Sequence, residues 1–214
     1  MAEVADKRKA QATGSRTRSI AFIALSIAVI TVSAWITIPF GPIPFTLQMF
    51  AITFAVIVLS PAEAMCAIAG YLAIGAVGVP VFSGMRGGFG VLAGPTGGFL
   101  WGYIFGVAAA VGLLWVVRRA RGERAFTQPR RDAELAVGSG KVAAFLRNFG
   151  FEALAGVVFT AVSYVCGWAQ YQVVAGVDGL QAFLVCCAPF IVVDLCKIVA
   201  AVLVAEAVRK AVGR

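Results

Sequence analysis

Long apolar runs, separated by short polar or Gly/Pro-rich breaks, make up most of the chain. The runs predict six membrane-spanning helices, over residues 20–38, 45–59, 63–78, 96–117, 149–174 and 181–208. A straight helical crossing of a bilayer takes about 20 apolar residues. The second and third runs are shorter, so we expect one of them to be tilted or shielded by protein. The pattern as a whole predicts an all-α membrane protein with six transmembrane helices.

Proline and glycine mark the breaks between the runs. Pro39 ends the first run, and Pro42 and Pro44 predict a short, stiff turn, because proline fixes φ and removes a backbone donor. Residues 79–95 form a Gly- and Pro-rich connection, which we expect on the outer side of the membrane.

Basic residues fall almost entirely into three groups. Of the 18 Lys and Arg residues, all but Arg86 and Lys197 lie in residues 1–19, 118–147 or 209–214. Loops that stay in the cytoplasm carry an excess of Lys and Arg. Six spans place both termini and the central loop on the same side of the membrane, so the charges agree with the number of spans. Both termini are therefore predicted to be cytoplasmic.

The six predicted spans form one transmembrane domain. It covers residues 20–208 and includes the basic cytoplasmic loop 118–147. A basic cytoplasmic tail, residues 1–19, precedes it and is expected to be frayed, and residues 209–214 form a short cytoplasmic tail. The Gly-x-x-x-x-Gly-Lys-Ser/Thr pattern is absent from the sequence, so the chain does not itself hydrolyse ATP through a P-loop.

The composition agrees with lipid as the solvent. The chain is 61% hydrophobic and 13% charged, with a mean hydropathy of +0.92, whereas soluble domains are about 45–50% apolar and about 25% charged. The net charge of +8 does not indicate a nucleic-acid partner, because the basic clusters follow the positive-inside pattern. Nucleic-acid binding would need them folded onto one face with aromatic residues between them. The five cysteines lie in apolar stretches without metal spacing, and histidine is absent. We therefore expect neither a metal site nor a cofactor.

Two charged residues lie inside the last apolar run. Asp194 and Lys197 are three residues apart, which places both side chains on one face of a helix. A charge near the bilayer centre costs about 2.5–3.5 kcal/mol on insertion scales, so such residues usually face an interior cavity. A carboxylate acceptor beside an ammonium donor complements a group with adjacent N–H donors and a carbonyl. We interpret the pair as a polar ligand site, with an ion pair that only fastens helices together as the alternative.

The outer segment contains further candidates. Gly87, Gly88 and Phe89 belong to a Gly-rich stretch, and non-helical backbone at membrane depth is tolerated only when it is buried in protein or lines a cavity. A re-entrant loop over a ligand pocket fits this rule, and a flexible outer loop is the alternative. Arg86 is the one basic residue expected on the outer side. Its guanidinium could pair with a substrate carboxylate, or instead with Asp178 or solvent.

Polar side chains in other spans complete the predicted site. Thr46 and Gln48 can donate and accept hydrogen bonds at the outer end of the second span, and Tyr164 in the fifth span is predicted to form a wall of the pocket. Ala24 and Ala28 form a small-x-x-x-small pair on the first helix. Such pairs let helices approach each other closely in lipid.

Taken together, these motifs resemble one known family. The resemblance rests on Gly41-Pro42-Ile43-Pro44-Phe45-Thr46-Leu47-Gln48, Gly78-Val79-Pro80-Val81-Phe82, Gly87-Gly88-Phe89-Gly90-Val91-Leu92-Ala93-Gly94-Pro95-Thr96-Gly97-Gly98-Phe99, Pro189-Phe190 and Asp194-Leu195-Cys196-Lys197. The chain resembles BioY, the biotin-specific substrate-binding (S) component of energy-coupling factor (ECF) transporters. The resemblance covers residues 20–208 apart from the enlarged basic loop.

The resemblance implies the six-helix ECF S-component fold, in a prokaryotic cell membrane, with a biotin pocket near the outer face. In that family the Asp-x-x-Lys pair, here Asp194 and Lys197, engages the ureido ring of biotin. The Ala-rich face of the first helix, here Ala24 and Ala28, docks on a transmembrane coupling subunit that two ATPase subunits drive. Transport then proceeds by reorientation of the loaded S component against the coupling subunit.

The leading hypothesis is a non-enzymatic membrane protein for biotin uptake. An S component for another small vitamin is excluded only by the family signature, and a biotin carrier that works alone as an oligomer stays open. A membrane enzyme that used Asp194 and Lys197 would lack histidine, a metal cluster and a nucleophile–base pair. A channel would need polar rings from several spans, whereas only one span carries charge in its middle.

Overall fold

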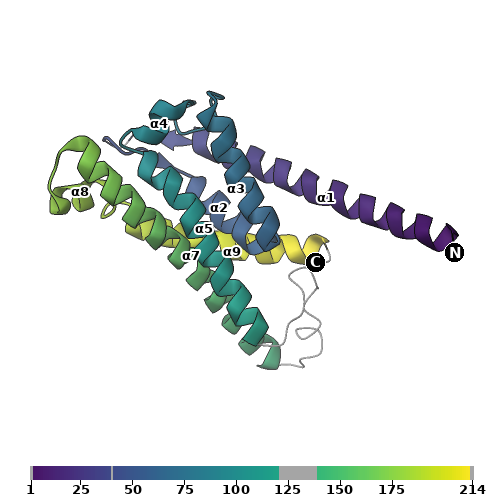
Figure 1. Ribbon diagram of the computed structural model, residues 1–214. Helices are drawn as coiled ribbons and strands as arrows, with labels where there is room; N and C mark the ends of the chain where they lie inside the picture. Colours follow the sequence, from purple (N-terminus) through teal and green to yellow (C-terminus); the bar gives the residue numbers. More distant parts are fainter. Residues whose placement is uncertain (1, 40, 121–138, 213–214) are drawn as a thin grey trace.

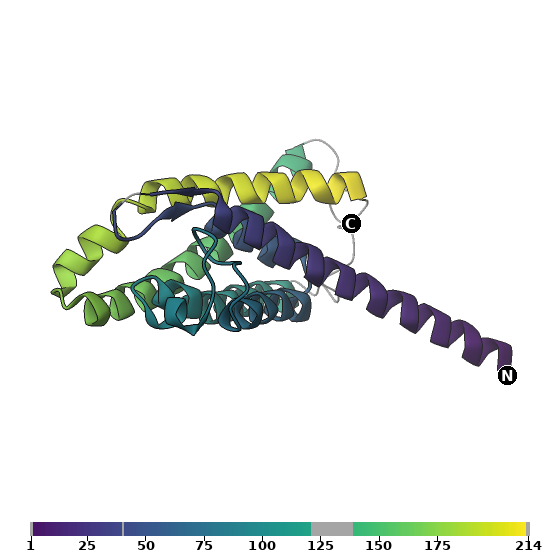
Figure 2. The same ribbon diagram turned by 90° about the horizontal axis from the view of Figure 1, so that it is seen from above.

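The computed structural model describes residues 2–39, 41–120 and 139–212, and these residues are mainly helical. The helices are α1 (Ala2–Trp35), α2 (Gln48–Val58), α3 (Pro61–Ala76), α4 (Phe89–Ala93), α5 (Gly97–Ala120), α7 (Ser139–Ala175), α8 (Gly179–Cys186) and α9 (Ile191–Val212). Two short strands, β1 (Thr37–Ile38) and β2 (Phe45–Thr46), pair antiparallel. Figure 1 shows a helical bundle from which the N-terminal part of α1 projects, and Figure 2 shows the same projection from above.

Several of these helices can cross a membrane. Among the described residues, three helical segments are long and apolar enough to do so alone: Arg16–Trp35, Gly97–Ala120 and Leu146–Ala175. Helices α8 and α9 form a fourth candidate span, bent by 45° at the break between them. Helices α2 and α3 are apolar but shorter, as their sequences predicted. The chain is therefore an all-helical membrane protein with three or four candidate spans.

Two predictions about the ends of the chain are wrong in detail. Residues 1–19 were expected to be frayed, but α1 already begins at Ala2. Ala, Glu, Lys, Arg and Gln are strong helix formers, and they extend the apolar helix backwards. The run 181–208 is not one helix, because it is interrupted between Cys186 and Ile191. Pro189 lies in this break, where its missing N–H removes a helical hydrogen bond.

Two predicted connections also take a more definite form. The Pro-rich turn lies within a β-hairpin in which Thr37 pairs with Thr46 and Ile38 with Phe45. The second span therefore begins at Gln48 rather than at Phe45. Helices α5 and α7 extend into the predicted loop 118–147 from its two sides, and the remaining residues 121–138 lie outside the described part of the chain.

Helices α5 and α7 pack side by side along much of their length (Figure 1). Gly98, Gly102 and Gly106 repeat every four residues on the face of α5 that contacts α7. A Cβ atom at Gly102 would lie 2.7 Å from the Cα atom of Ser163, which is closer than such atoms approach. Glycine on this face therefore allows the two backbones to touch, as small residues do between helices in lipid.

The start of α3 is fixed by a capping box. The Ser60 backbone N–H donates to Glu63 Oε2 over 2.9 Å, and the Glu63 N–H donates to Ser60 Oγ over 3.4 Å. Pro61 occupies the first turn, where its missing N–H is no loss. These contacts define where the chain turns from α2 into α3.

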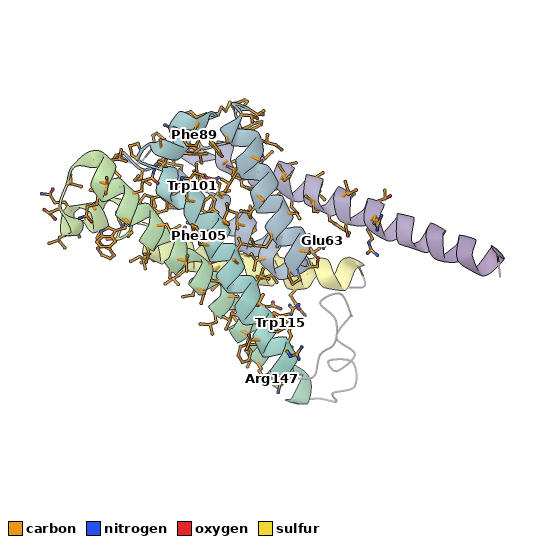
Figure 3. The ribbon with its side chains drawn as sticks, in the orientation of Figure 1. Glu63, Phe89, Trp101, Phe105, Trp115 and Arg147 are labelled. Atoms are coloured by element: carbon orange, nitrogen blue, oxygen red, sulfur yellow. The ribbon has the colours of Figure 1, made fainter. Side chains whose placement is uncertain are left out.

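Large apolar side chains remain exposed around the bundle. On α5 they include Trp101, Phe105 and Trp115, which Figure 3 labels along that helix. Inside, Tyr71, Phe82 and other side chains form one main core under the hairpin and α4. An apolar exterior over a packed interior is typical of a protein whose surface meets lipid.

Candidate functional site

A cavity opens where α9 begins, next to the hairpin β1–β2 and the connection that precedes α4. About 620 Å³ of space in and around it is free of protein atoms, and part of this space is open solvent. Sites for small organic ligands are usually concave, with mainly apolar walls and a few polar groups. The polar or charged side chains in its wall are those of Thr46, Gln48, Ser83, Arg86, Thr96, Tyr103, Tyr164, Asp194 and Lys197.

Asp194 and Lys197 form a buried ion pair in this wall. Asp194 is 3% exposed and Lys197 is 7% exposed, and Lys197 Nζ lies 2.7 Å from Asp194 Oδ1. Lys197 Nζ also donates to the backbone carbonyl of Thr46 over 2.7 Å. The same nitrogen lies 3.8 Å from the centre of the Phe45 ring, which is within the range of a cation–π contact. The ammonium group thus joins α9 to β2.

A second helix holds the carboxylate. Tyr164 Oη on α7 donates to Asp194 Oδ2 over 2.5 Å, so each carboxylate oxygen accepts one hydrogen bond from the protein. A carboxylate oxygen can accept two, and an ammonium group has three donors. The pair can therefore accept from further N–H groups of a ligand and donate to a ligand carbonyl.

Thr46 and Gln48 continue the hydrogen bonding away from Lys197. Thr46 Oγ1 donates to Gln48 Oε1 over 3.3 Å, and Gln48 Nε2 donates to Tyr71 Oη over 2.6 Å. Tyr71 Oη in turn donates to the Val81 carbonyl over 3.0 Å. The Gln48 side chain therefore borders the cavity while its amide is engaged by the protein.

Arg86 lies at the mouth of the cavity. It is exposed, and its Nε donates to the Ser83 carbonyl over 3.1 Å. Asp178, the other predicted partner, instead caps α8 by accepting from the Gln181 N–H. Arg86 is the basic residue that faces the cavity from the connection between α3 and α4.

Three predicted site residues lie elsewhere. Gly87 packs its backbone against the turn after α3, where a Cβ atom would lie 2.7 Å from the Gly78 carbonyl oxygen. Gly88 has φ +95° and donates its N–H to the Gly75 carbonyl over 2.7 Å. Phe89 is 66% exposed at the start of α4 (Figure 3). None of these three residues belongs to the cavity wall. Gly87 and Gly88 instead hold the connection against the end of α3 and the turn that follows it.

Aromatic walls are the part of the site that sequence reasoning missed. Tyr103 from α5, Phe82 from the connection and Phe190 from the α8–α9 break line the cavity. Phe45 stacks on Phe190 with ring centres 5.9 Å apart, and Phe99 meets Tyr164 edge to face at 6.2 Å. Only Tyr103 could have been recognised from the sequence, because its hydroxyl is a polar group inside an apolar run. A phenylalanine in such a run is equally typical of a hydrophobic core.

Ala24 and Ala28 lie on α1 and are not part of the cavity wall. Both side chains are exposed on α1, next to the exposed Leu25 and Val29. This face of α1 is open to lipid or to another helix. Among the described residues, no group of three or more His, Cys, Asp or Glu side chains is placed to hold a metal ion.

The fold defines a multi-pass membrane protein, and its cavity has a buried ion pair in an otherwise largely apolar wall. The model of the BioY family matches residues 6–214, and the chain belongs to that family. The chain is 30% identical over 191 residues to the probable biotin transporter BioY of Pyrococcus horikoshii, covering 89% of this chain and 96% of that protein. It is 32% identical over 195 residues to the biotin transporter BioY of Rhizobium etli, covering 90% and 93%.

Two further comparisons agree with this assignment. The biotin transporter BioY of Thermotoga maritima is 51% identical over 87 residues, a stretch that covers 41% of this chain and 51% of that protein. A crystal structure of the S-component for biotin from an ECF-type ABC transporter superposes with a TM-score of 0.72, at 20% identity, over 92% of this chain and 93% of the other. The chain therefore has the ECF S-component fold. The predictions of family, membrane location and a transporter rather than an enzyme are confirmed.

Proposed function

We propose that this chain binds biotin in the cavity and mediates its uptake as the substrate-specificity component of an ECF transporter. The observation that carries the proposal is the buried Asp194–Lys197 pair in the wall of a cavity that is otherwise lined mainly by apolar and aromatic side chains. Membership of the BioY family supports biotin as the ligand. The likeness to the S-component for biotin supports the role within an ECF transporter.

The two ends of biotin match two ends of the cavity. The ureido ring has two N–H donors and one carbonyl, which suit the remaining lone pairs of Asp194 and the remaining donor of Lys197. The apolar thiophane ring and valeryl chain then lie along the aromatic wall. The valeryl carboxylate lies at the mouth, where Arg86 provides the positive charge.

Six crossings with cytoplasmic termini are part of the proposal. Helices α1, α2, α3, α5 and α7 form five crossings, and α8 with α9 forms the sixth. The basic groups in residues 1–19, 118–147 and 209–214 support this topology, because it places all three on the cytoplasmic side. The cavity then opens towards the outer face, at the end opposite the basic groups.

The partners of the chain in this proposal are a transmembrane coupling subunit and two ATPase subunits. The exposed alanines Ala24 and Ala28 of α1 form the docking face for the coupling subunit. Their small side chains suit the close approach of a helix from another subunit.

Equilibrium binding of radiolabelled biotin to the detergent-purified chain tests the ligand. Saturable binding that biotin analogues displace, and that thiamine and riboflavin do not, is the expected result. Displacement by another vitamin would point to a different S-component specificity. Absence of binding by folded protein would return the Asp194–Lys197 pair to a purely structural role.

A further inference from the structure

Tyr71 lies directly behind the cavity wall and takes part in two buried hydrogen bonds. Its side chain is 0% exposed, so it cannot touch a ligand in the cavity. Its hydroxyl accepts from Gln48 Nε2 over 2.6 Å and donates to the Val81 carbonyl over 3.0 Å. Tyr71 therefore connects α2, which borders the cavity, to the connection between α3 and α4.

The segment that Tyr71 holds is the one that carries Arg86. Phe82, next to Val81, packs edge to face on the Tyr71 ring with ring centres 5.5 Å apart. The Phe82 N–H donates to the Arg86 carbonyl over 2.9 Å. A tight turn closes between them, because Gly84 and Met85 both have positive φ, at 69° and 56°. The position of Arg86 is thus set from Val81 and Phe82, both of which contact Tyr71.

On its other side Tyr71 reaches the charged pair. Gln48 accepts from Thr46 Oγ1 over 3.3 Å, and the Thr46 carbonyl accepts from Lys197 Nζ over 2.7 Å. An unbroken series of contacts therefore runs from Lys197 to the turn with Arg86. Buried polar groups that are fully paired hold their neighbours in one geometry.

We propose that Tyr71 is a positioning residue that places Arg86 for the charged end of the ligand and so determines selectivity for a carboxylate. This inference rests on the proposed function. It concerns the carboxylate end of the ligand, opposite the end that Asp194 and Lys197 bind. Tyr71 itself does not touch the ligand. Without the Tyr71 hydroxyl, Val81 loses its donor and the turn loses the contact that orients it.

The test compares biotin with biotin methyl ester, which lacks the negative charge, on the full-length purified chain. Tyr71→Phe keeps the ring packing and removes both hydrogen bonds. We expect biotin to bind about tenfold more weakly, which is the usual effect of one lost hydrogen bond to a charged group. The affinity for the methyl ester should stay within about twofold, because the ester makes no ion pair with Arg86 and Lys197 keeps its own bonds to Asp194 and the Thr46 carbonyl.

This comparison separates positioning from stability. A variant that only folds less well binds both ligands more weakly and in the same proportion. Arg86→Ala should abolish the preference for biotin over its ester, and Tyr71→Phe should have no further effect on that preference in the Arg86→Ala background. Tyr171→Phe is the matched control, because Tyr171 is buried on α7 outside the cavity wall; its affinities should equal those of the wild type.

Gly84→Val provides a second route to the same answer. Gly84 is at the exposed tip of the turn with φ +69°, where a β-branched residue is strained. It should cause the same selective loss for biotin without altering the core. Equal weakening of both ligands, or no change, in Tyr71→Phe and Gly84→Val would overturn the inference. Equal binding of biotin and its ester by the wild type would also overturn the inference, while leaving the proposed biotin binding intact. A wild type that binds neither ligand would overturn the proposed function itself.

Discussion

The charged pair in the cavity is complete before any ligand arrives. Asp194 accepts from Lys197 and from Tyr164, and Lys197 also donates to the Thr46 carbonyl. A buried ion pair costs desolvation of both partners, and removing one partner leaves an uncompensated charge. The pair is therefore stable as a unit, and a ligand adds hydrogen bonds to it through unused lone pairs and one unused donor.

Asp194→Asn tests this arrangement at the level of one atom. The amide keeps the shape but loses the charge and places an N–H₂ group where the site presents acceptors. Two charge-assisted hydrogen bonds of about 1.5–3 kcal/mol each depend on this carboxylate, so we expect biotin affinity to fall by at least about 100-fold. Titration of the purified variant with radiolabelled biotin measures the change in affinity.

Asp178→Asn is the control for this change. Asp178 is an exposed carboxylate that caps α8, and Asn serves equally well at that position. Its affinity for biotin should match that of the wild type. If Asp194→Asn also retained wild-type affinity, the ureido ring would have to bind somewhere else in the cavity.

At the level of helices, the contact between α5 and α7 holds the aromatic wall. Tyr103 on α5 and Tyr164 on α7 both face the cavity, and the glycines of α5 set the distance between these helices. Any increase in that distance moves both tyrosines. Packing between these helices therefore affects the site as well as the stability of the bundle.

Gly102→Val should destabilise the protein by about 1–3 kcal/mol, as overpacking of a close interface does. The new side chain would meet the backbone of α7 at Ser163. A lower melting temperature in detergent is the expected observation. Gly112→Val on the same helix is the matched control, because a Cβ atom at Gly112 would have no neighbour within 4 Å. Equal melting temperatures for the two variants would contradict the close α5–α7 contact.

The same elements show what the sequence could predict. Asp194 and Lys197 were identifiable because charge inside an apolar run has few explanations, and the structure places both in the cavity wall. Gly87 and Gly88 were predicted to line the cavity because glycine permits close approach, but the sequence does not say what approaches; here it is the backbone at the end of α3. Phe82 was not identified because a buried aromatic residue looks the same in a core and in a ligand site.

On the scale of the whole molecule, the cavity and the projecting part of α1 lie at different ends. The hairpin, the connection with Arg86 and the start of α9 enclose the cavity at one end, whereas α1 projects from the bundle at its N-terminal end (Figure 2). The exposed, apolar side of α1 runs between the cavity end of the bundle and the projecting N-terminal end of α1. A partner that contacts α1 can thus act on the protein without touching the ligand.

Ala24→Leu should separate transport from binding. The larger side chain would keep a partner helix at a distance from α1, so we expect uptake of radiolabelled biotin by cells to fall several-fold. Binding to the purified chain should be unchanged, because Ala24 is exposed and lies outside the cavity wall. Ala161→Leu, at an exposed alanine of α7, is the control and should leave uptake at the wild-type rate. Wild-type uptake by Ala24→Leu would place the docking face on another helix.

The break between α8 and α9 has an electrostatic consequence. Because α9 begins at Ile191, Asp194 lies in its first turn, where the aligned peptide dipoles of the helix create a partial positive charge. A continuous helix over residues 181–208 would have placed the same carboxylate in mid-helix, without that field. The interruption therefore supplies Asp194 with positive potential from the backbone itself, in addition to the charge of Lys197.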